Sequence, residues 1–292
     1  MKMAIWPTVG LLLANAALAG QPIDETHDVN ADALITISNV KGKVSIAAGS
    51  SKEVQISGTL GDGVQELSVS GGGDRLEIEV RHPRNSRHVQ ATVLKLLVPV
   101  GSSVEVETVS ADVEVSGLQG DAIQVETVSG DVEIEAEPNR LELTTVSGDI
   151  ELKTQAGRTE MATVSGDVDA VGLTGELNVN TVSGDLLIST GALSRAHFES
   201  VSGDMEIDSS LEPQAALSIS SLNGDVELFL PEKLSARCEV ETFSGSIRSD
   251  RGTVRKAEYG QQKSLSFRAG DGAGRIEIES FSGDVRIQSG VK

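Results

Sequence analysis

Serine, glycine and aspartate recur together along this sequence in the pentapeptide Thr-Val-Ser-Gly-Asp, which reads identically at 127–131, 145–149, 163–167 and 181–185. A serine beside a carboxylate could belong to a nucleophilic site, and regularly spaced carboxylates could bind calcium. Nucleophilic catalysis also needs a base, and the four histidines form no Ser/His/Asp arrangement and no zinc-type spacing with the motif. The spacing of the motif is therefore used to distinguish a catalytic or metal site from a structural repeat.

The motif belongs to a longer series of related pentapeptides with an interval of 18–21 residues. Its variants are TVSAD at 108–112, SVSGD at 200–204, SLNGD at 221–225, TFSGS at 242–246 and SFSGD at 280–284. A fixed interval of this kind is typical of a repeat architecture. The last interval is twice as long as the others, which predicts one coil that has lost its signature around Ser266–Gly274.

The residues around each motif alternate between apolar and polar. Leu141 and Leu143 precede one copy, Ile150 and Leu152 follow it, and polar residues stand between them. This period of two predicts strands with one buried face, and each interval holds two short strands and two turns. The fold class predicted is therefore all-β: a single-stranded β-helix (β-solenoid) with coils of 18–21 residues. Equivalent side chains stack in such a fold, so every coil requires the same residue at the same place.

The glycine of each motif is expected to have a positive φ or to lie where neighbouring backbones crowd. The predicted structural turn residues are Gly130, Gly148, Gly166, Gly184, Gly203, Gly224, Gly245 and Gly283.

The aspartate of each motif is expected to join a column of carboxylates at one corner, about 5 Å apart. The calcium candidates in this column are Asp131, Asp149, Asp167 and Asp185. Calcium-binding nonapeptide repeats carry a denser Gly-Asp pattern, and neighbouring charges at this spacing cost only about 1 kcal/mol in water. Capping of the corner is therefore sufficient, and no metal or other cofactor is predicted.

The second residue of each motif is apolar although strict alternation places it outside. If Thr145 points inward, Val146 points outward, and its equivalents would form an exposed stripe that could bind a partner. The candidates for this interaction stripe are Val146, Val164, Val182 and Val201. The favoured interpretation is that the corner resets the alternation and buries these residues.

Composition excludes several functions. The formal net charge of −20 disfavours nucleic acid and anionic membranes, because phosphate binding requires clustered Lys and Arg. Cys238 is the single cysteine and is predicted to be a buried small hydrophobe rather than a nucleophile. The basic segment Arg81–His88 is predicted to be a solvated loop, with docking of an acidic partner or binding of a metal through His82 and His88 as the alternatives.

Residues 1–19 read as a signal peptide, with Lys2, an apolar stretch and Ala17-Leu18-Ala19 as the cleavage pattern. Residues 20–33 are predicted to be a flexible leader and 34–101 an irregular N-terminal β section that caps the solenoid. The regular repeats are expected over 102–292. Asn39–Ile46 imitates the motif and is a candidate divergent first coil. No transmembrane segment is predicted in the mature chain.

The repeated TVSGDV, with VEVETVS and NVKGKVSI, resembles the bacterial toastrack-type domains of unknown function, also called putative-adhesin domains. Related single-stranded solenoids include autotransporter-adhesin head domains. The resemblance implies a right-handed solenoid outside the cytoplasm, either periplasmic or secreted to the cell surface, and it brings no catalytic residues. The function expected is a non-catalytic envelope or cell-surface scaffold that binds an envelope protein or a surface glycan as an adhesin does. A sensor module that binds a membrane partner in envelope stress is the alternative, and a polysaccharide-active β-helix enzyme is a distant one.

Overall fold

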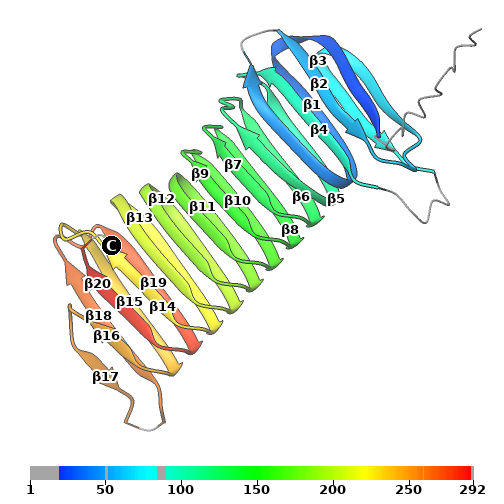
Figure 1. The fold of residues 1–292 in the computed structure, drawn as a ribbon. Helices are drawn as coiled ribbons and strands as arrows, with labels where there is room; N and C mark the ends of the chain where they lie inside the picture. The colour runs from blue at the N-terminus through cyan, green and yellow to red at the C-terminus, as the bar shows by residue number, and fades with distance from the viewer. Residues whose placement is uncertain (1–19, 50–51, 84–89, 259, 291–292) are drawn as a thin grey trace, which may run out of the picture.

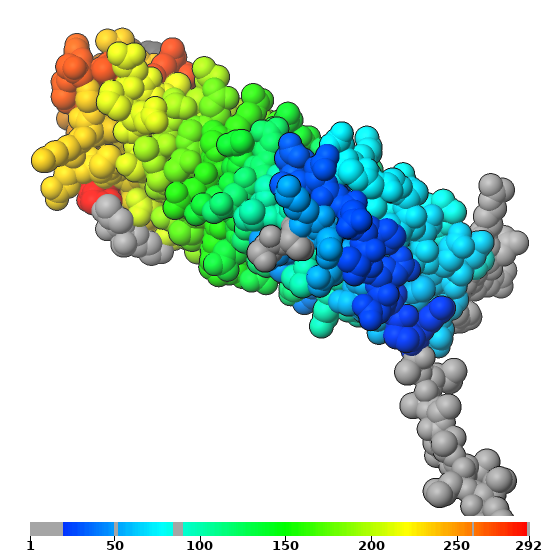
Figure 2. Space-filling view, turned by 90° about the horizontal axis from the view of Figure 1, so that it is seen from above, coloured from blue at the N-terminus to red at the C-terminus, as the bar shows by residue number. Residues whose placement is uncertain are grey.

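The computed structural model describes residues 20–49, 52–83, 90–258 and 260–290, and within them every regular element is a β-strand. The predicted signal peptide and residues 84–88 of the predicted basic loop lie outside the described residues. The strands form one elongated stack that runs from the N-terminal to the C-terminal end of the molecule (Figures 1 and 2). The all-β prediction is therefore confirmed.

Twenty strands build the stack. The first ten are β1 (Gln21–Gly49), β2 (Glu53–Leu60), β3 (Glu66–Arg81), β4 (Thr92–Pro99), β5 (Ser103–Ser116), β6 (Ala122–Ser129), β7 (Val132–Ala136), β8 (Arg140–Ser147), β9 (Ile150–Thr154) and β10 (Arg158–Ser165). The others are β11 (Val168–Ser183), β12 (Leu186–Ser202), β13 (Met205–Asn223), β14 (Val226–Leu230), β15 (Ala236–Ser244), β16 (Ile247–Ser249), β17 (Val254–Lys256), β18 (Lys263–Ala269), β19 (Gly274–Ser282) and β20 (Val285–Ser289).

Successive repeats lie on top of one another in register. Strand β8 pairs in parallel with β6 on one side and β10 on the other, so that Thr145 lies between Thr127 and Thr163. On the opposite face β9 pairs in parallel with β7 and β11. Each level thus contributes one strand to a first face, turns at Ser-Gly-Asp, and contributes a second strand to the other face. This is the coil that the interval of 18–21 residues predicts.

The core is the thin layer between the two faces. Leu141 and Leu143 of the first face and Ile150 and Leu152 of the second are at most 2% exposed. Such a narrow interior suits aliphatic side chains, and Phe198 is the one buried aromatic residue among the described residues. The aromatic content of 2% follows from this shape.

The N-terminal end differs from the prediction of a flexible leader over 20–33. Residues 21–28 are the first part of β1 and pair antiparallel with β2, which pairs antiparallel with β4. Ile23, Val29 and Ala33 are buried, and this burial holds the segment on the end of the stack. The prediction of a divergent first coil is confirmed, because Asn39 aligns with Thr108 and Ile46 with Val115 of β5.

The C-terminal end corrects the prediction of a lost coil around Ser266–Gly274. Strand β18 lies there and pairs antiparallel with β15, so that it covers the end of the first face. The last coil, β19 and β20, does not extend the stack beyond the preceding level of β15 and β16. It is inserted between the level of β13 and β14 and the level of β15 and β16. Figure 1 shows β19 beside β15, although 29 residues separate Ser244 from Gly274. The long interval is therefore a detour of the chain and not a missing signature.

The predicted corner glycines are largely confirmed. Seven have a positive φ of 126–154°: Gly130, Gly148, Gly166, Gly184, Gly203, Gly224 and Gly283. A Cβ built on Gly166 would lie 2.1 Å from the backbone oxygen of Gly148, so crowding applies as well. Gly245 has no positive φ, but a Cβ there would lie 2.0 Å from the oxygen of Gly283.

Candidate functional site

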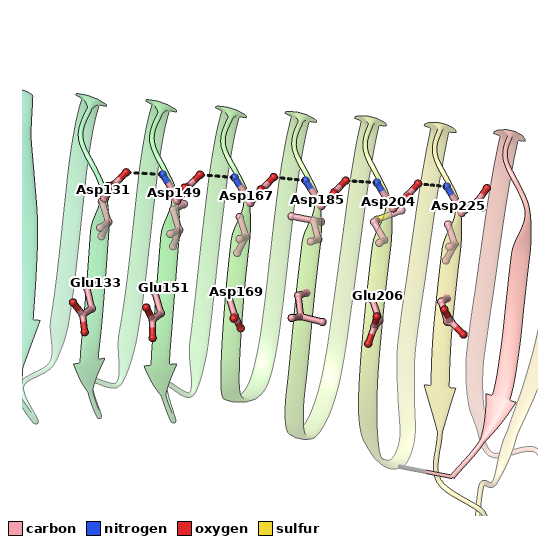
Figure 3. Close-up of a pocket in the computed structure, with 18 of the residues that line it drawn as sticks. Asp131, Glu133, Asp149, Glu151, Asp167, Asp169, Asp185, Asp204, Glu206 and Asp225 are labelled. Carbon is pink, nitrogen blue, oxygen red and sulfur yellow. Dashed lines mark hydrogen bonds between the residues drawn. The ribbon is translucent and has the colours of Figure 1, made fainter. Parts of the chain in front are cut away.

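The corner aspartates form a hydrogen-bonded ladder. The backbone N–H of Asp149 donates to Oδ1 of Asp131 at 3.1 Å, and that of Asp167 donates to Oδ1 of Asp149 at 3.0 Å (Figure 3). The same bond continues up the stack through Asp185, Asp204, Asp225, Asp284 and Ser246. Each carboxylate thus caps a backbone donor of the next level. This is the structural role that was expected for the corner aspartates from the sequence.

A trough of about 900 Å³ runs beside this ladder. One wall is the column of corner aspartates, and the strand between the walls turns its side chains, such as Val132 and Ile150, into the core. The other wall is the next outward column, where Figure 3 shows Glu133, Glu151 and Asp169 on successive levels. The aspartate column and a second column, acidic between the ends except at Leu187, therefore face a common space along the stack.

Cations line the trough only at its two ends. Lys43 contacts Glu114 at the N-terminal end, and this hydrogen bond lowers the pKa of the Glu114 carboxyl. At the other end Arg286 lies 3.2 Å from Glu227 and Arg248 lies 3.8 Å from Asp284. Between these ends the lining is acidic or apolar. The trough is therefore a long anionic channel whose ends are neutralised.

The calcium candidates lie in one column, as expected, but they do not converge. Among the described residues no three His, Cys, Asp or Glu side chains come together as a group that could hold a metal ion. Asp131, Asp149, Asp167 and Asp185 each accept a backbone N–H instead. The ladder suits capping better than coordination of a cation, since coordination takes several oxygens around one point.

Two of the described histidines contact glutamates, whereas His82 is half-buried and neither of its ring nitrogens has a hydrogen-bond partner among the described residues. His27 contacts Glu25 at 3.1 Å, and His197 lies 3.8 Å from Glu199 on the first face. Cys238 is fully buried, and burial raises the pKa of its thiol to about 12, which confirms its prediction as a small buried hydrophobe.

The apolar stripe is exposed, which corrects the favoured interpretation that the corner buries it. Val146, Val164 and Val182 are each 46% exposed and Val201 is 40% exposed. The alternation of the first face continues to the last residue before the corner, so Thr145 turns inward and Val146 outward. The threonine column is buried in its place, from Thr108 to Thr181.

Sequence reasoning missed the trough. The signal was present as the acidic residue two positions after each corner aspartate, in Asp131–Glu133, Asp149–Glu151 and Asp167–Asp169. Alternation places both residues of such a pair outward on one face, and stacking turns the pairs into two facing columns. What the sequence does not show is the volume that lies between these columns.

The sequence matches the Toastrack DUF4097 family over residues 33–230 and again over 199–288. It has no significant match among curated proteins. Two solved structures from Parabacteroides distasonis ATCC 8503 are similar in fold at 12% identity. One, called a "putative lipid binding protein", has a TM-score of 0.54, with 92% of this chain and 97% of the other covered. The second, called a "putative adhesin", has a TM-score of 0.50 and coverages of 93% and 98%. At this identity the likeness shows the fold alone.

Proposed function

This chain belongs to the Toastrack DUF4097 family, and we propose that it is an exported, non-catalytic interaction protein: a single-stranded, right-handed β-solenoid that acts as an adhesin-like scaffold at the cell envelope or surface. The single observation that carries this proposal is the trough, a long surface with one wall of corner aspartates and a second wall that is acidic on most levels. A similar fold called a putative adhesin supports it.

The trough favours an elongated partner that carries positive charge. Its aspartate column and the acidic residues of its second column recur on most levels, so a compact ligand would find several equivalent positions. A basic, extended segment of an envelope protein would instead place successive charges along both walls. A surface glycan could donate hydroxyl hydrogen bonds to the same carboxylates, but it would leave their charge uncompensated.

A non-catalytic role is supported by how the corner residues are used. The aspartate that could have assisted a serine is bound to the backbone of the next level, and His197, the histidine of the regular repeats, lies 3.8 Å from Glu199. The acidic repeat of the trough is interrupted between its ends at the exposed Leu187, an apolar residue with no reactive group.

Export is supported by the sequence of residues 1–19. In the part of the chain that the structure describes, no helix has the length and apolar character needed to cross a membrane.

The test is retention of the purified mature protein on isolated cell envelopes. We expect the double variant Glu133→Lys/Asp169→Lys, in the wall of the trough, to lose at least about tenfold in affinity, as charge reversal at a complementary surface does. The matched control is Glu160→Lys/Glu239→Lys, which changes net charge equally on the outer side of the first face and should bind as wild type does. Equal losses of affinity in both variants would show that net charge alone causes the effect. Unaltered binding of the trough variant would show that the trough is not the binding surface.

A further inference from the structure

The exposed stripe is longer than the four valines that the motif predicts. In the order in which the levels stack, it consists of Val40, Val109, Val128, Val146, Val164, Val182, Val201, Leu222, Phe281 and Phe243. These are ten of the fourteen large exposed hydrophobic side chains among the described residues, and they are 38–56% exposed. A contiguous apolar patch of this kind usually marks an interaction surface.

The C-terminal end of the stripe depends on the inserted coil. The rings of Phe243 and Phe281 stack with centroids 5.1 Å apart and planes inclined by 6°. They do so because β19 lies next to β15, since the two strands pair with Thr242 beside Ser280. The insertion therefore completes an unbroken ladder, one apolar side chain to a level.

The serine border of the stripe is neutral apart from Lys41, whereas the other border is neutral at the central levels and carries glutamates, such as Glu107 and Glu279, toward the two ends. On the corner side stands a column of serines, such as Ser147, Ser165 and Ser183, all exposed. On the other side the central levels carry Thr144, Ala162 and Asn180. A basic partner would find no counter-charge beside these central rungs, and the trough that could attract it opens on the second face, beyond the corner.

The spacing of the ladder restricts the occupant further. Stacked strands repeat at about 4.8 Å, whereas side chains on one face of an extended strand repeat at roughly 6.6 Å. A helix turn advances by about 5.4 Å. Neither an extended strand nor a helix that lies along the stripe therefore keeps its side chains in register with the rungs over ten levels. A second copy of this chain has the same repeat at every level and can match each rung.

Charge then selects the orientation of the second copy. A two-fold axis parallel to the stack brings each rung against its own equivalent, valine on valine and phenylalanine on phenylalanine. It also reverses the transverse direction, so the serine border of one copy faces the mixed border of the other. An antiparallel arrangement would instead bring Glu107 opposite Glu279 of the other copy.

We propose that the stripe from Val40 to Phe243 is the seam of a parallel, side-by-side homodimer. Ten half-exposed apolar side chains and their serine border approach the area of about 800 Å² per partner that a stable interface needs. The net charge of −20 on each copy opposes association at long range, and salt screens this repulsion over about 10 Å at 0.1 M. Dimerisation should therefore strengthen as salt concentration rises.

The first test is sedimentation equilibrium of the mature protein at low and high salt. We expect a monomer–dimer equilibrium that shifts to dimer at high salt and whose dissociation constant rises more than about tenfold in Val146→Glu/Val164→Glu/Val182→Glu. Leu97→Glu/Val100→Glu/Val171→Glu is the control, since it adds the same charge and these side chains are 45–48% exposed outside both the stripe and the trough. Thermal melts should show both variants folded, because every substituted side chain already faces solvent.

The second test is disulfide trapping of the orientation. In the parallel dimer Val146→Cys faces itself and oxidises to a covalent dimer; the native Cys238 is buried and does not compete. In the antiparallel dimer Val146 would face Val201, so that only a mixture of Val146→Cys and Val201→Cys would crosslink across unlike chains. That result would overturn the parallel seam. A monomer at every salt concentration, a dimer indifferent to the stripe variant, or a monomer that binds neutral phosphatidylcholine vesicles through the stripe would overturn the proposal.

Discussion

Gly166 shows why the corner accepts no side chain. Its φ of 129° is unfavourable for any residue with a Cβ, and that Cβ would lie 2.1 Å from the backbone oxygen of Gly148. Because Gly148 has the same relation to Gly130, no level can shift without moving its neighbour. The glycine is fixed by the stack as much as by its own turn.

We expect Gly166→Ala to lower the free energy of unfolding by at least about 2 kcal/mol, from backbone strain and the clash together. Urea denaturation followed by circular dichroism measures the loss. Gly49→Ala is the control, since Gly49 has no positive φ and a Cβ there would find its nearest atom at 3.5 Å. Equal stability of the two variants would show that the corner is more adaptable than the structure implies.

Asp284 makes the inserted coil sensitive to acid. The pKa of its carboxyl is lowered from the ordinary value of 3.8 by Ser246, whose hydroxyl and backbone N–H both face it, and the N–H donates at 2.8 Å. A lowered pKa stabilises the folded state above the ordinary value, and this contribution is lost as the pH falls through the lowered pKa. The inserted coil is therefore more stable at neutral pH than in acid.

We predict that Asp284→Asn, which keeps an acceptor oxygen but cannot titrate there, loses less stability than wild type between neutral pH and about pH 3. Urea midpoints across this range give the measurement. Identical acid losses in both proteins would show that Asp284 does not couple protonation to folding.

The corner residues differ in how well their positions can be predicted from the sequence. Gly130 to Gly224 were predictable because a positive φ leaves a strong preference for glycine. The exposure of Val146 was not, because an apolar residue next to a turn usually signals burial. The buried partner at this corner is the preceding Thr145, a polar residue that composition alone would place outside.

At the scale of elements, β19 and β20 are the part that the sequence misplaces. Every level carries the same motif and the same alternation, so any coil could pair with any other in register. The interval of 38 residues between the last two motifs allowed either a degenerate coil or a detour. The structure resolves this by pairing β19 with both β13 and β15, while the antiparallel β17–β18 hairpin closes the end.

Engineered disulfides test this order directly. Ser220 lies beside Glu279 across β13 and β19, at a spacing within the Cα range of a disulfide. Ser220→Cys/Glu279→Cys should therefore oxidise within one chain, as a shift on non-reducing gels and a peptide map would show. Ser220→Cys/Glu241→Cys joins strands with β19 between them and should stay reduced; its oxidation would indicate coils stacked in sequence order.

At the scale of the whole molecule, the stack converts one short motif into long surfaces. The glycine and threonine of the motif build the interior of the corner, the aspartate forms the ladder and one wall of the trough, and the valine forms the stripe. The interval predicted the number of residues per coil, and alternation predicted the faces. The volume of the trough and the completed Phe243–Phe281 end of the stripe depend on the stack and its chain order, which no local pattern encodes.

We infer that the Ser-Gly-Asp corner is stabilised by hydrogen bonds to backbone N–H groups and needs no cation. The function of the protein then depends on the surfaces beside the corner. The direct measurement is the thermal unfolding midpoint of the mature protein in excess calcium and in excess chelator. The ladder from Asp131 to Asp225 predicts the same midpoint in both, since each N–H is already matched to a carboxylate. A midpoint that rises with calcium and falls with chelator would contradict the claim and make the corner a row of metal sites.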